Sequence, residues 1–343
     1  MKKILTVLSL ISLIFFVTYP GRIKAATAEA LTSAFEASSA TLKLYTGDDT
    51  ASSVMSSFGN VSPRQGGSFA VLSTGNATTT DTEADFPPPG EAGDTATLTL
   101  GFTVPSGMNS LLFDFYFLSQ EYPEWVGQYN DTFAATITGS SKVADGTNVA
   151  IDPEGHVIEV NSVTFAIIGA QAANFFQGTD FQNNGGTGWL IAGAPVGAGD
   201  NITLTFTIQD VGDGVVSSTV LLDNFRFDQG QLAGPGVQSK LFFNQSVLNL
   251  NDCGQTSLNL YSSTVATQDL TVNITNSNSN VLSLVNSQVT IPQYSSQATD
   301  KISINGLTDG TATLTATAAG FDSGTIDVIV SGCPILPQTG PDI

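Results

Sequence analysis

Apolar and polar residues alternate in short runs along most of the chain, and turn-forming residues separate the runs. Residues 111–118 place three phenylalanines on one side of such a run, and residues 133–137 and 204–208 alternate in the same way. This period of two is typical of strands that bury one face, so we predict two packed antiparallel sheets. Only residues 26–36 and 171–176 are candidates for short helices.

The last third of the chain shows the same alternation of apolar and polar residues, in shorter runs that end at polar turn residues. Seven or so strands in such a length are typical of an immunoglobulin-like sandwich. The predicted strands are Leu241–Leu250, Ser257–Tyr261, Leu270–Ile274, Val281–Leu284 with Gln288–Ile291, Lys301–Ile304, Ala312–Ala316 and Thr325–Val330.

A Gly- and Pro-bearing stretch without alternation, residues 229–239, separates the two parts. We therefore predict an all-β protein: a jelly-roll-like β-sandwich over residues 26–228, followed by an immunoglobulin-like β-sandwich over residues 240–333. The stretch from Gly306 to Ala318 resembles the bacterial Ig-like repeats of surface proteins.

Both ends of the chain carry targeting features. Residues 1–25 have two lysines, an apolar run and small residues, as a cleaved secretory signal has; the run is too short for a retained membrane anchor. Within the tail, residues 334–343, the pentapeptide Leu336-Pro337-Gln338-Thr339-Gly340 resembles the LPxTG signal that sortase cuts between Thr and Gly. Only three residues follow it, so either the chain is truncated or the match is accidental. We favour truncation and attachment to the cell wall.

The charge balance excludes one class of partner. The chain has 10 basic and 30 acidic residues, a net charge of −20, and four of the basic residues lie in the predicted signal. Such an acidic surface repels phosphate backbones, so nucleic acid is excluded as a partner. One histidine and two cysteines cannot build a zinc site rich in His and Cys.

The two cysteines, Cys253 and Cys333, bracket the second predicted sandwich. In an exported protein this placement indicates a disulfide. A reactive thiol would need basic neighbours that lower its pKa, and neither cysteine has one nearby in the sequence.

Three segments of the first part together resemble one known family. They are Ser119–Val126 with Asn130–Phe133, Asn148–Ile151 with Val160–Val163, and Asp210–Phe225. Their sequences are similar to the "SEEYPEYV…FNDxF", "NIA…VNNV" and Asp-Gly-rich segments of the choice-of-anchor domain, L type. Gln120 stands where that pattern usually has an acid. The resemblance implies an exported bacterial surface protein and no assigned activity.

Carboxylates are the most abundant reactive groups and cluster in the family-like loops. If the strands that carry them pair, they could converge on calcium, which prefers six to eight oxygen ligands. The alternative is a set of solvated turns that keep the surface soluble. The candidate calcium ligands are Glu121, Asp131, Asp210, Asp213 and Asp223.

Aromatic residues are the other candidates. Tyr122, Trp125 and Tyr129 lie in the Gly- and Pro-bearing loop after the first family segment. Exposed rings of this kind stack on sugars and anchor protein contacts. For Trp189 we expect a place in the core, as for most Trp residues of sandwiches.

We therefore predict a non-catalytic adhesion module that presents these rings to an extracellular glycan or protein surface, with calcium as an aid and with sortase and the cell wall as partners. One alternative is a structural spacer without a ligand. The other is a glycan hydrolase that uses two carboxylates, for which no sequence feature selects a pair.

Overall fold

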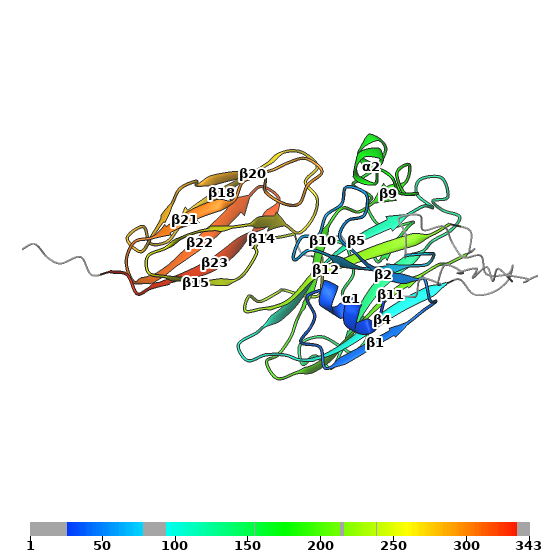
Figure 1. The fold of residues 1–343 in the computed structure, drawn as a ribbon, viewed down its shortest axis with the longest axis horizontal. Coiled ribbons are helices and arrows are strands. Elements are labelled where there is room, and N and C mark those ends of the chain that lie inside the picture. The colour runs from blue at the N-terminus through cyan, green and yellow to red at the C-terminus, as the bar shows by residue number, and fades with distance from the viewer. Residues whose placement is uncertain (1–25, 78–93, 154, 213–215, 238, 335–343) are drawn as a thin grey trace, which may run out of the picture.

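The computed structural model describes residues 26–77, 94–153, 155–212, 216–237 and 239–334. It contains two β-sandwiches that follow one another along the long axis of the molecule (Figure 1). The predicted all-β class is thus confirmed. The predicted signal, the LPQTG pentapeptide and Asp213 lie outside the described residues. Among the described residues, no helix has the length and apolar character needed to cross a membrane.

Two sheets make the first sandwich and enclose its core. One has the order β1 (Leu42–Thr46), β4 (Thr95–Thr103), β11 (Asn201–Gln209), β6 (Thr132–Thr138) and β7 (Thr147–Asn148), with β8 (Ile158–Glu159) also on β6. The other has the order β13 (Gly236–Val237), β10 (Leu190–Pro195), β5 (Ser110–Ser119), β12 (Ser218–Asp228), β3 (Phe69–Ser73) and β2 (Ser52–Met55), with β9 (Gly185–Gly186) on β5.

The first of these sheets follows the alternation of its sequence. In β11 every second residue is buried, and the threonines between them face outward. Thr97 and Thr99 of β4 pair with Thr207 and Thr205 of β11, with hydroxyl oxygens 3.3 and 3.5 Å apart. The sheet therefore buries one face and shows water a face of paired polar side chains.

The second sheet departs from the prediction that each sheet buries only one face. All ten residues of β5 are buried. Its phenylalanines point into the core between the sheets, and Leu112, Asp114 and Tyr116 lie under other parts of the chain on the opposite face. The alternation in this strand therefore separates two buried environments, which a pattern of apolar residues alone does not distinguish.

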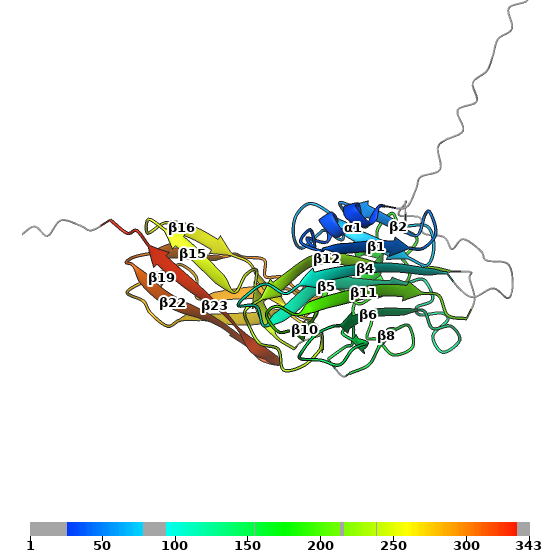
Figure 2. The same ribbon diagram turned by 90° about the horizontal axis from the view of Figure 1, so that it is seen from below.

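Two short helices occur where the sequence predicted them. Helix α1 (Ala28–Ala34) begins at Thr27, whose hydroxyl accepts a hydrogen bond of 3.2 Å from the Ala30 amide. It packs against β1, β2 and β3, so it closes the side where the two sheets have their edges (Figure 2). Helix α2 (Ala170–Phe175) lies in a long connection.

The second sandwich has its own core. One sheet has the order β15 (Val247–Asn251), β23 (Phe321–Ser331), β22 (Gly310–Ala318), β18 (Leu270–Asn276) and β20 (Gln288–Ile291). Strands β16 (Gln255–Leu258), β21 (Ile302–Gly306) and β19 (Leu282–Leu284) form another, and β14 (Leu241–Phe243) pairs with β17 (Leu260–Ser262). Strands β15 and β23 run parallel, whereas the other pairs are antiparallel.

Two of the predicted strands in this sandwich are each divided in two. The run 241–250 becomes β14 and β15, and the run around 257–261 becomes β16 and β17. In both cases the chain leaves one sheet and joins another, which a continuous apolar alternation conceals. The predicted disulfide joins Cys253 and Cys333, whose Cα atoms are 4.9 Å apart.

The stretch expected to link the sandwiches is fastened to the first one. Strand β13 lies within it and pairs with β10. Nearer its start, the Ser110 hydroxyl donates a 2.7 Å hydrogen bond to the Gly230 carbonyl, and Asn109 donates one of 2.7 Å to the Gln229 carbonyl. Few residues therefore separate the two folded bodies.

Candidate functional site

The predicted aromatic residues lie in a compact turn after β5, which we call the aromatic loop (residues 120–131). The Trp125 amide donates a 2.7 Å hydrogen bond to the Glu121 carbonyl, and the Gln128 amide donates one of 2.9 Å to the Trp125 carbonyl. The rings of Trp125 and Tyr129 are half-buried, with centroids 5.9 Å apart. They form a small aromatic surface at the tip of the loop.

Tyr122 has a different place in this loop. Its ring stacks on Phe165 with centroids 4.3 Å apart and packs against the core. The side-chain amide of Asn184 holds the loop from the other side, since its nitrogen donates to the carbonyls of Gln120 and Tyr122 at 2.8 and 3.1 Å. Tyr122 therefore anchors the loop, and Trp125 and Tyr129 are the rings that reach its surface.

Three of the predicted calcium ligands come together at the base of this loop. Glu121, Asp131 and Asp210 are buried where β5 ends, β6 begins and β11 ends. The Asp131 amide donates to Glu121 Oε2 at 3.2 Å, and the Val211 amide donates to Asp131 Oδ1 at 3.0 Å. Within the described part of the chain, no group of three or more His, Cys, Asp or Glu side chains has the arrangement of a metal site.

Asp223, the fifth predicted ligand, belongs to a different cluster. It lies opposite Asp114 in the pairing of β12 with β5, whereas the aromatic loop follows Ser119, five residues farther along β5. Its carboxylate accepts hydrogen bonds from the backbone amides of Arg64, Gln65 and Asn224. The structure therefore does not bring Asp223 together with the other acids.

We call this second group the ionic cluster: Glu36, Arg64, Asp114, Asp223 and Arg226. Arg64 Nε lies 3.1 Å from Asp114 Oδ2, and Arg226 Nη1 lies 2.9 Å from Asp114 Oδ1. Asp114 is fully buried and the Arg64 side chain is 3% exposed. A buried carboxylate needs such partners, because a lone charge in a dry interior is costly.

A bulge in β12 shapes this cluster. The register with β5 shifts between Asp223 and Arg226, and Asn224 has a φ of 56°. Asparagine tolerates this left-handed conformation better than most residues. The Asn224 side chain donates a 3.2 Å hydrogen bond to the Asp114 carboxylate, and the Asn224 backbone carbonyl accepts one of 2.7 Å from Arg226. The bulge thus lets one short segment contact both an acid and a base.

The two carboxyl groups at the edge of the cluster share one environment. Burial, and then the neighbouring Asp223, raise the pKa of Glu36 to about 8. Burial also raises the pKa of Asp223 to about 6, against the hydrogen bonds that it accepts. At neutral pH Glu36 therefore holds a proton, whereas Asp223, with its lower pKa, is ionised.

Arg64 also joins the two sandwiches. Its guanidinium carbon lies 4.3 Å above the centre of the Tyr261 ring, and Nη1 donates a 3.3 Å hydrogen bond to the Ser296 hydroxyl. The same side chain thus contacts β5 of the first sandwich and two elements of the second. Desolvation at this junction lowers the Arg64 pKa, and Asp114 opposes the change.

Apolar residues surround this contact. Leu112 and Ile191 of the first sandwich pack with Phe242 and Tyr261 of the second. The Ile191 amide also donates a 2.9 Å hydrogen bond to the Ser263 carbonyl. This junction covers the outer face of β5 at Leu112, and residues of the first sandwich such as Phe58 and Phe176 cover that face at Tyr116 and Leu118. The strand is therefore buried on both sides.

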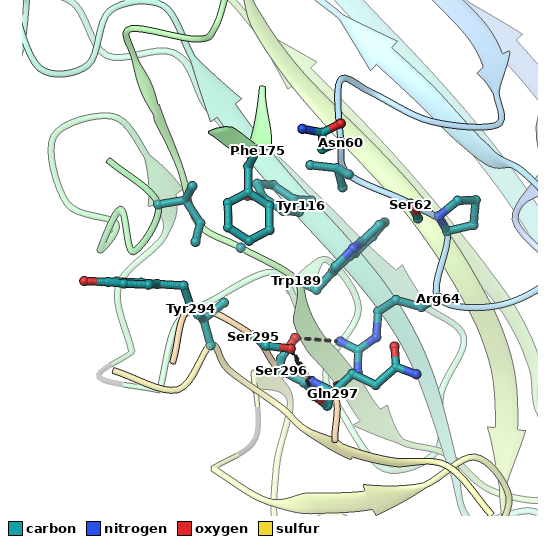
Figure 3. Close-up of a pocket in the computed structure, with 15 residues that line it drawn as sticks. Asn60, Ser62, Arg64, Tyr116, Phe175, Trp189, Tyr294, Ser295, Ser296 and Gln297 are labelled. Atoms are coloured by element: carbon teal, nitrogen blue, oxygen red, sulfur yellow. Dashed lines mark hydrogen bonds between the residues drawn. The ribbon is translucent and has the colours of Figure 1, made fainter. Parts of the chain in front are cut away.

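A cavity of about 200 Å³ opens beside Arg64 at the junction (Figure 3). The first sandwich contributes Phe175 and Trp189 to its wall, and the second contributes Tyr294, Ser295 and Gln297. As expected, Trp189 is mostly buried: it contacts Phe69 and Tyr116 edge-on, and 9% of it is exposed. The cavity is therefore built by both parts of the chain.

A comparison with known protein families shows which family this chain is related to. The profile of the choice-of-anchor L domain matches residues 23–228, more than half of the chain. The chain belongs to the choice-of-anchor L domain family. Its first sandwich is this domain, and membership identifies an extracellular surface protein.

Other comparisons add little to the choice-of-anchor L assignment. No curated protein sequence matches the chain. The enzymatically active domain of bacteriophage CBA120 tailspike protein 4 is 10% identical with a TM-score of 0.26; the match covers 60% of this chain and 21% of that one. Domains 4 and 5 of the S-layer protein SbsC are 13% identical with a TM-score of 0.22, over 85% of this chain and 99% of that one. These likenesses carry no argument about function.

Sequence reasoning missed the ionic cluster of the choice-of-anchor L domain. One signal was present: Asp114 interrupts a run of aromatic and aliphatic residues, where a charge needs a buried partner. The partners, Arg64 and Arg226, are distant in sequence and come from a chain with few basic residues. The pairing of β5 with β12 brings Arg226 to Asp114, and the connection between β2 and β3 brings Arg64 there.

Proposed function

We propose that the protein is a non-catalytic adhesin that is attached to the cell wall through its C-terminal end and binds an extracellular glycan or protein surface through the aromatic loop. The second, immunoglobulin-like sandwich serves as its stalk. Sortase is the partner that attaches it.

One observation carries this proposal: the aromatic loop and the described C-terminal end point in opposite directions. Asp327 of β23 lines a cavity together with Ser110, at the start of β5. Phe321, six residues earlier in β23, lines another cavity together with Leu190, which pairs with Phe115 in the middle of β5. Strands β5 and β23 therefore run in opposite senses past the junction. From there β5 runs to the loop and β23 to Ser331, a span of roughly 40 Å at about 3.3 Å per residue. A wall-bound end would leave the loop outermost.

The loop itself is suited to contact. Trp125 and Tyr129 are large, rigid rings at the loop surface, and Tyr122 and Asn184 hold the backbone beneath them. Rigid aromatic side chains lose little conformational entropy on binding, so they are efficient anchors. We expect Trp125→Ala to weaken binding at least about tenfold, by the loss of about 1.4 kcal/mol or more.

The test of adhesion uses immobilised cell-wall glycans and extracellular matrix proteins as surfaces. Wild type, Trp125→Ala and Trp125→Phe are compared, with Lys301→Met as an exposed control on the other sandwich. Binding that falls in Trp125→Ala, recovers in Trp125→Phe and persists in the control supports the proposal. Absence of wild-type binding to every surface favours the spacer alternative, and release of reducing sugar from a glycan would favour the hydrolase.

Attachment is tested in the full-length protein in a sortase-bearing host. We expect wild type in the fraction that muramidase releases from the wall, and Thr339→Ala in the membrane fraction or the medium. An unchanged distribution of Thr339→Ala would contradict attachment through this pentapeptide.

Calcium assistance stays a prediction. If Glu121, Asp131 and Asp210 take part in a calcium site, millimolar calcium should raise the thermal midpoint of the first sandwich, because a ligand that binds only the folded state stabilises it. Asp131→Asn should abolish that rise. Equal midpoints with calcium and with chelator would dismiss the site.

A further inference from the structure

The junction cavity contains the materials of a small binding site. Aromatic side chains line it from both sandwiches: Phe175 and Trp189 on one side and Tyr294 on the other (Figure 3). Phe175 and Tyr294 are half-buried, so each keeps part of its ring surface exposed. At about 200 Å³ the cavity is smaller than the sites that hold drug-sized ligands, and its size suits one ring.

Charge narrows the class of ligand. No Asp, Glu, Lys or His lines the cavity, and its one charged residue is Arg64. That guanidinium already contacts Asp114, Ser296 and the Tyr261 ring. A cation would find no carboxylate here, and an anion would have to compete with Asp114. The cavity therefore favours a neutral ligand.

Polar groups at the wall favour a ligand with hydroxyl groups. The Gln297 side chain is exposed at the cavity, and its side-chain amide makes no hydrogen bond of standard geometry within the described chain. The side-chain nitrogen of Asn60 donates a 2.7 Å hydrogen bond to the Asn174 carbonyl, and the side-chain oxygen of Asn60 can accept a bond from a ligand. The Tyr116 hydroxyl is buried beside the backbone of Gly188 and forms no hydrogen bond of standard geometry. Amides and hydroxyls of this kind can both donate and accept.

We propose that the junction cavity binds one ring of a neutral saccharide, with the apolar face of the sugar against the aromatic rings and its hydroxyl groups toward Gln297 and Asn60. This inference rests on the proposed function as a surface-binding protein, and it names a second site and a ligand class for it. Stacking on Tyr294 is its central contact.

A site shared by two sandwiches has a mechanical consequence. Phe175 and Trp189 belong to the first sandwich and Tyr294 and Gln297 to the second, so a bound ring contacts both. A ligand that binds only the closed junction stabilises it. Saccharide binding should therefore raise the resistance of the junction to unfolding as well as hold a glycan.

The experiment is a binding titration of the full chain, which contains both sandwiches, with NMR or calorimetry as the measurement. The probes are the methyl glycosides of glucose, galactose, mannose and N-acetylglucosamine and short oligomers of each, at millimolar concentration. We compare wild type, Tyr294→Ala, Tyr294→Phe and Gln297→Ala. Tyr294→Ala should weaken binding about tenfold, as expected for loss of one stacking contact, and Tyr294→Phe should keep it. Gln297→Ala, at an exposed position, should weaken binding without affecting folding.

Trp125→Ala separates this site from the aromatic loop. Binding of a saccharide that Tyr294→Ala and Gln297→Ala weaken and Trp125→Ala preserves supports the cavity. Loss in Trp125→Ala alone would assign the saccharide to the loop and overturn the cavity proposal. A wild type that binds none of these probes also overturns it. In either case adhesion through the loop is judged separately, on the immobilised surfaces.

Discussion

Arg64 is the residue whose replacement tests the junction most directly. The variant Arg64→Met keeps much of the volume of the side chain and removes its charge. It breaks the ion pair with Asp114 and the contacts with Tyr261 and Ser296. Loss of one partner of a buried pair costs about 3 to 5 kcal/mol. Since Asp114 keeps Arg226 at 2.9 Å, we expect the lower end, about 3 kcal/mol.

The expected loss is large enough to measure by calorimetry. For folded units of this size, each kcal/mol shifts the thermal midpoint by about 2 to 4 °C, so the midpoint should fall by roughly 6 to 12 °C. Because Arg64 joins the two sandwiches, we also expect the unfolding transition to separate into two. Lys301→Met changes the same charge at an exposed position and should shift the free energy of unfolding by less than about 0.5 kcal/mol.

A double-mutant cycle isolates the ion pair from the loss of packing. Arg64→Met should cost less in an Asp114→Asn background than in wild type, with a coupling of about 0.5 to 3 kcal/mol. A midpoint equal to that of wild type in Arg64→Met would refute the assignment of Arg64 as the link between the sandwiches, and additive effects in the cycle would refute the ion pair with Asp114.

Three further predictions concern pH, the fit of the junction and the disulfide. Since the pKa of Glu36 is raised to about 8 in the folded protein, its contribution to stability is complete below about 4.5 and is lost as pH rises through about 8; Glu36→Gln should therefore flatten the dependence of the thermal midpoint on pH, and parallel profiles would contradict the raised pKa. Gly188 has a φ of 73°, and a Cβ there would lie 1.9 Å from Val265 Cγ2 across the junction; Gly188→Ala should cost about 1 to 3 kcal/mol in denaturant unfolding, and Val265→Ala should restore only part of it because the backbone strain persists. Replacement of both Cys253 and Cys333 by Ser opens a loop with a sequence separation of 80 residues and should lower the free energy of unfolding by about 2 to 4 kcal/mol, and a value equal to that of wild type would contradict the stabilising role of the disulfide.

The aromatic loop illustrates how far a family-like sequence segment can be interpreted. Its place after β5 follows from the end of the apolar run at Ser119, and its three rings were candidates from the sequence. Which of them faces outward depends on Phe165, a residue far along the chain that stacks on Tyr122. The same holds for the acids: Asp131 and Asp210 meet at strand ends, and Asp223 lies elsewhere because of its position along β12.

The sequence by itself determined the class of the protein, the number of its sandwiches, the disulfide and the family segments. These depend on local alternation, on turn residues and on the placement of two cysteines, all of which act within short stretches of chain or follow from composition. The tertiary structure decided what covers the outer face of β5. The buried Asp114 pairs with both Arg64 and Arg226, and Arg64 also contacts the second sandwich; no period in the sequence encodes such a meeting of distant segments. The junction forms because docking of the second sandwich covers the apolar side chains of Leu112 and Ile191 and also gives the buried Arg64 guanidinium its contact with Tyr261.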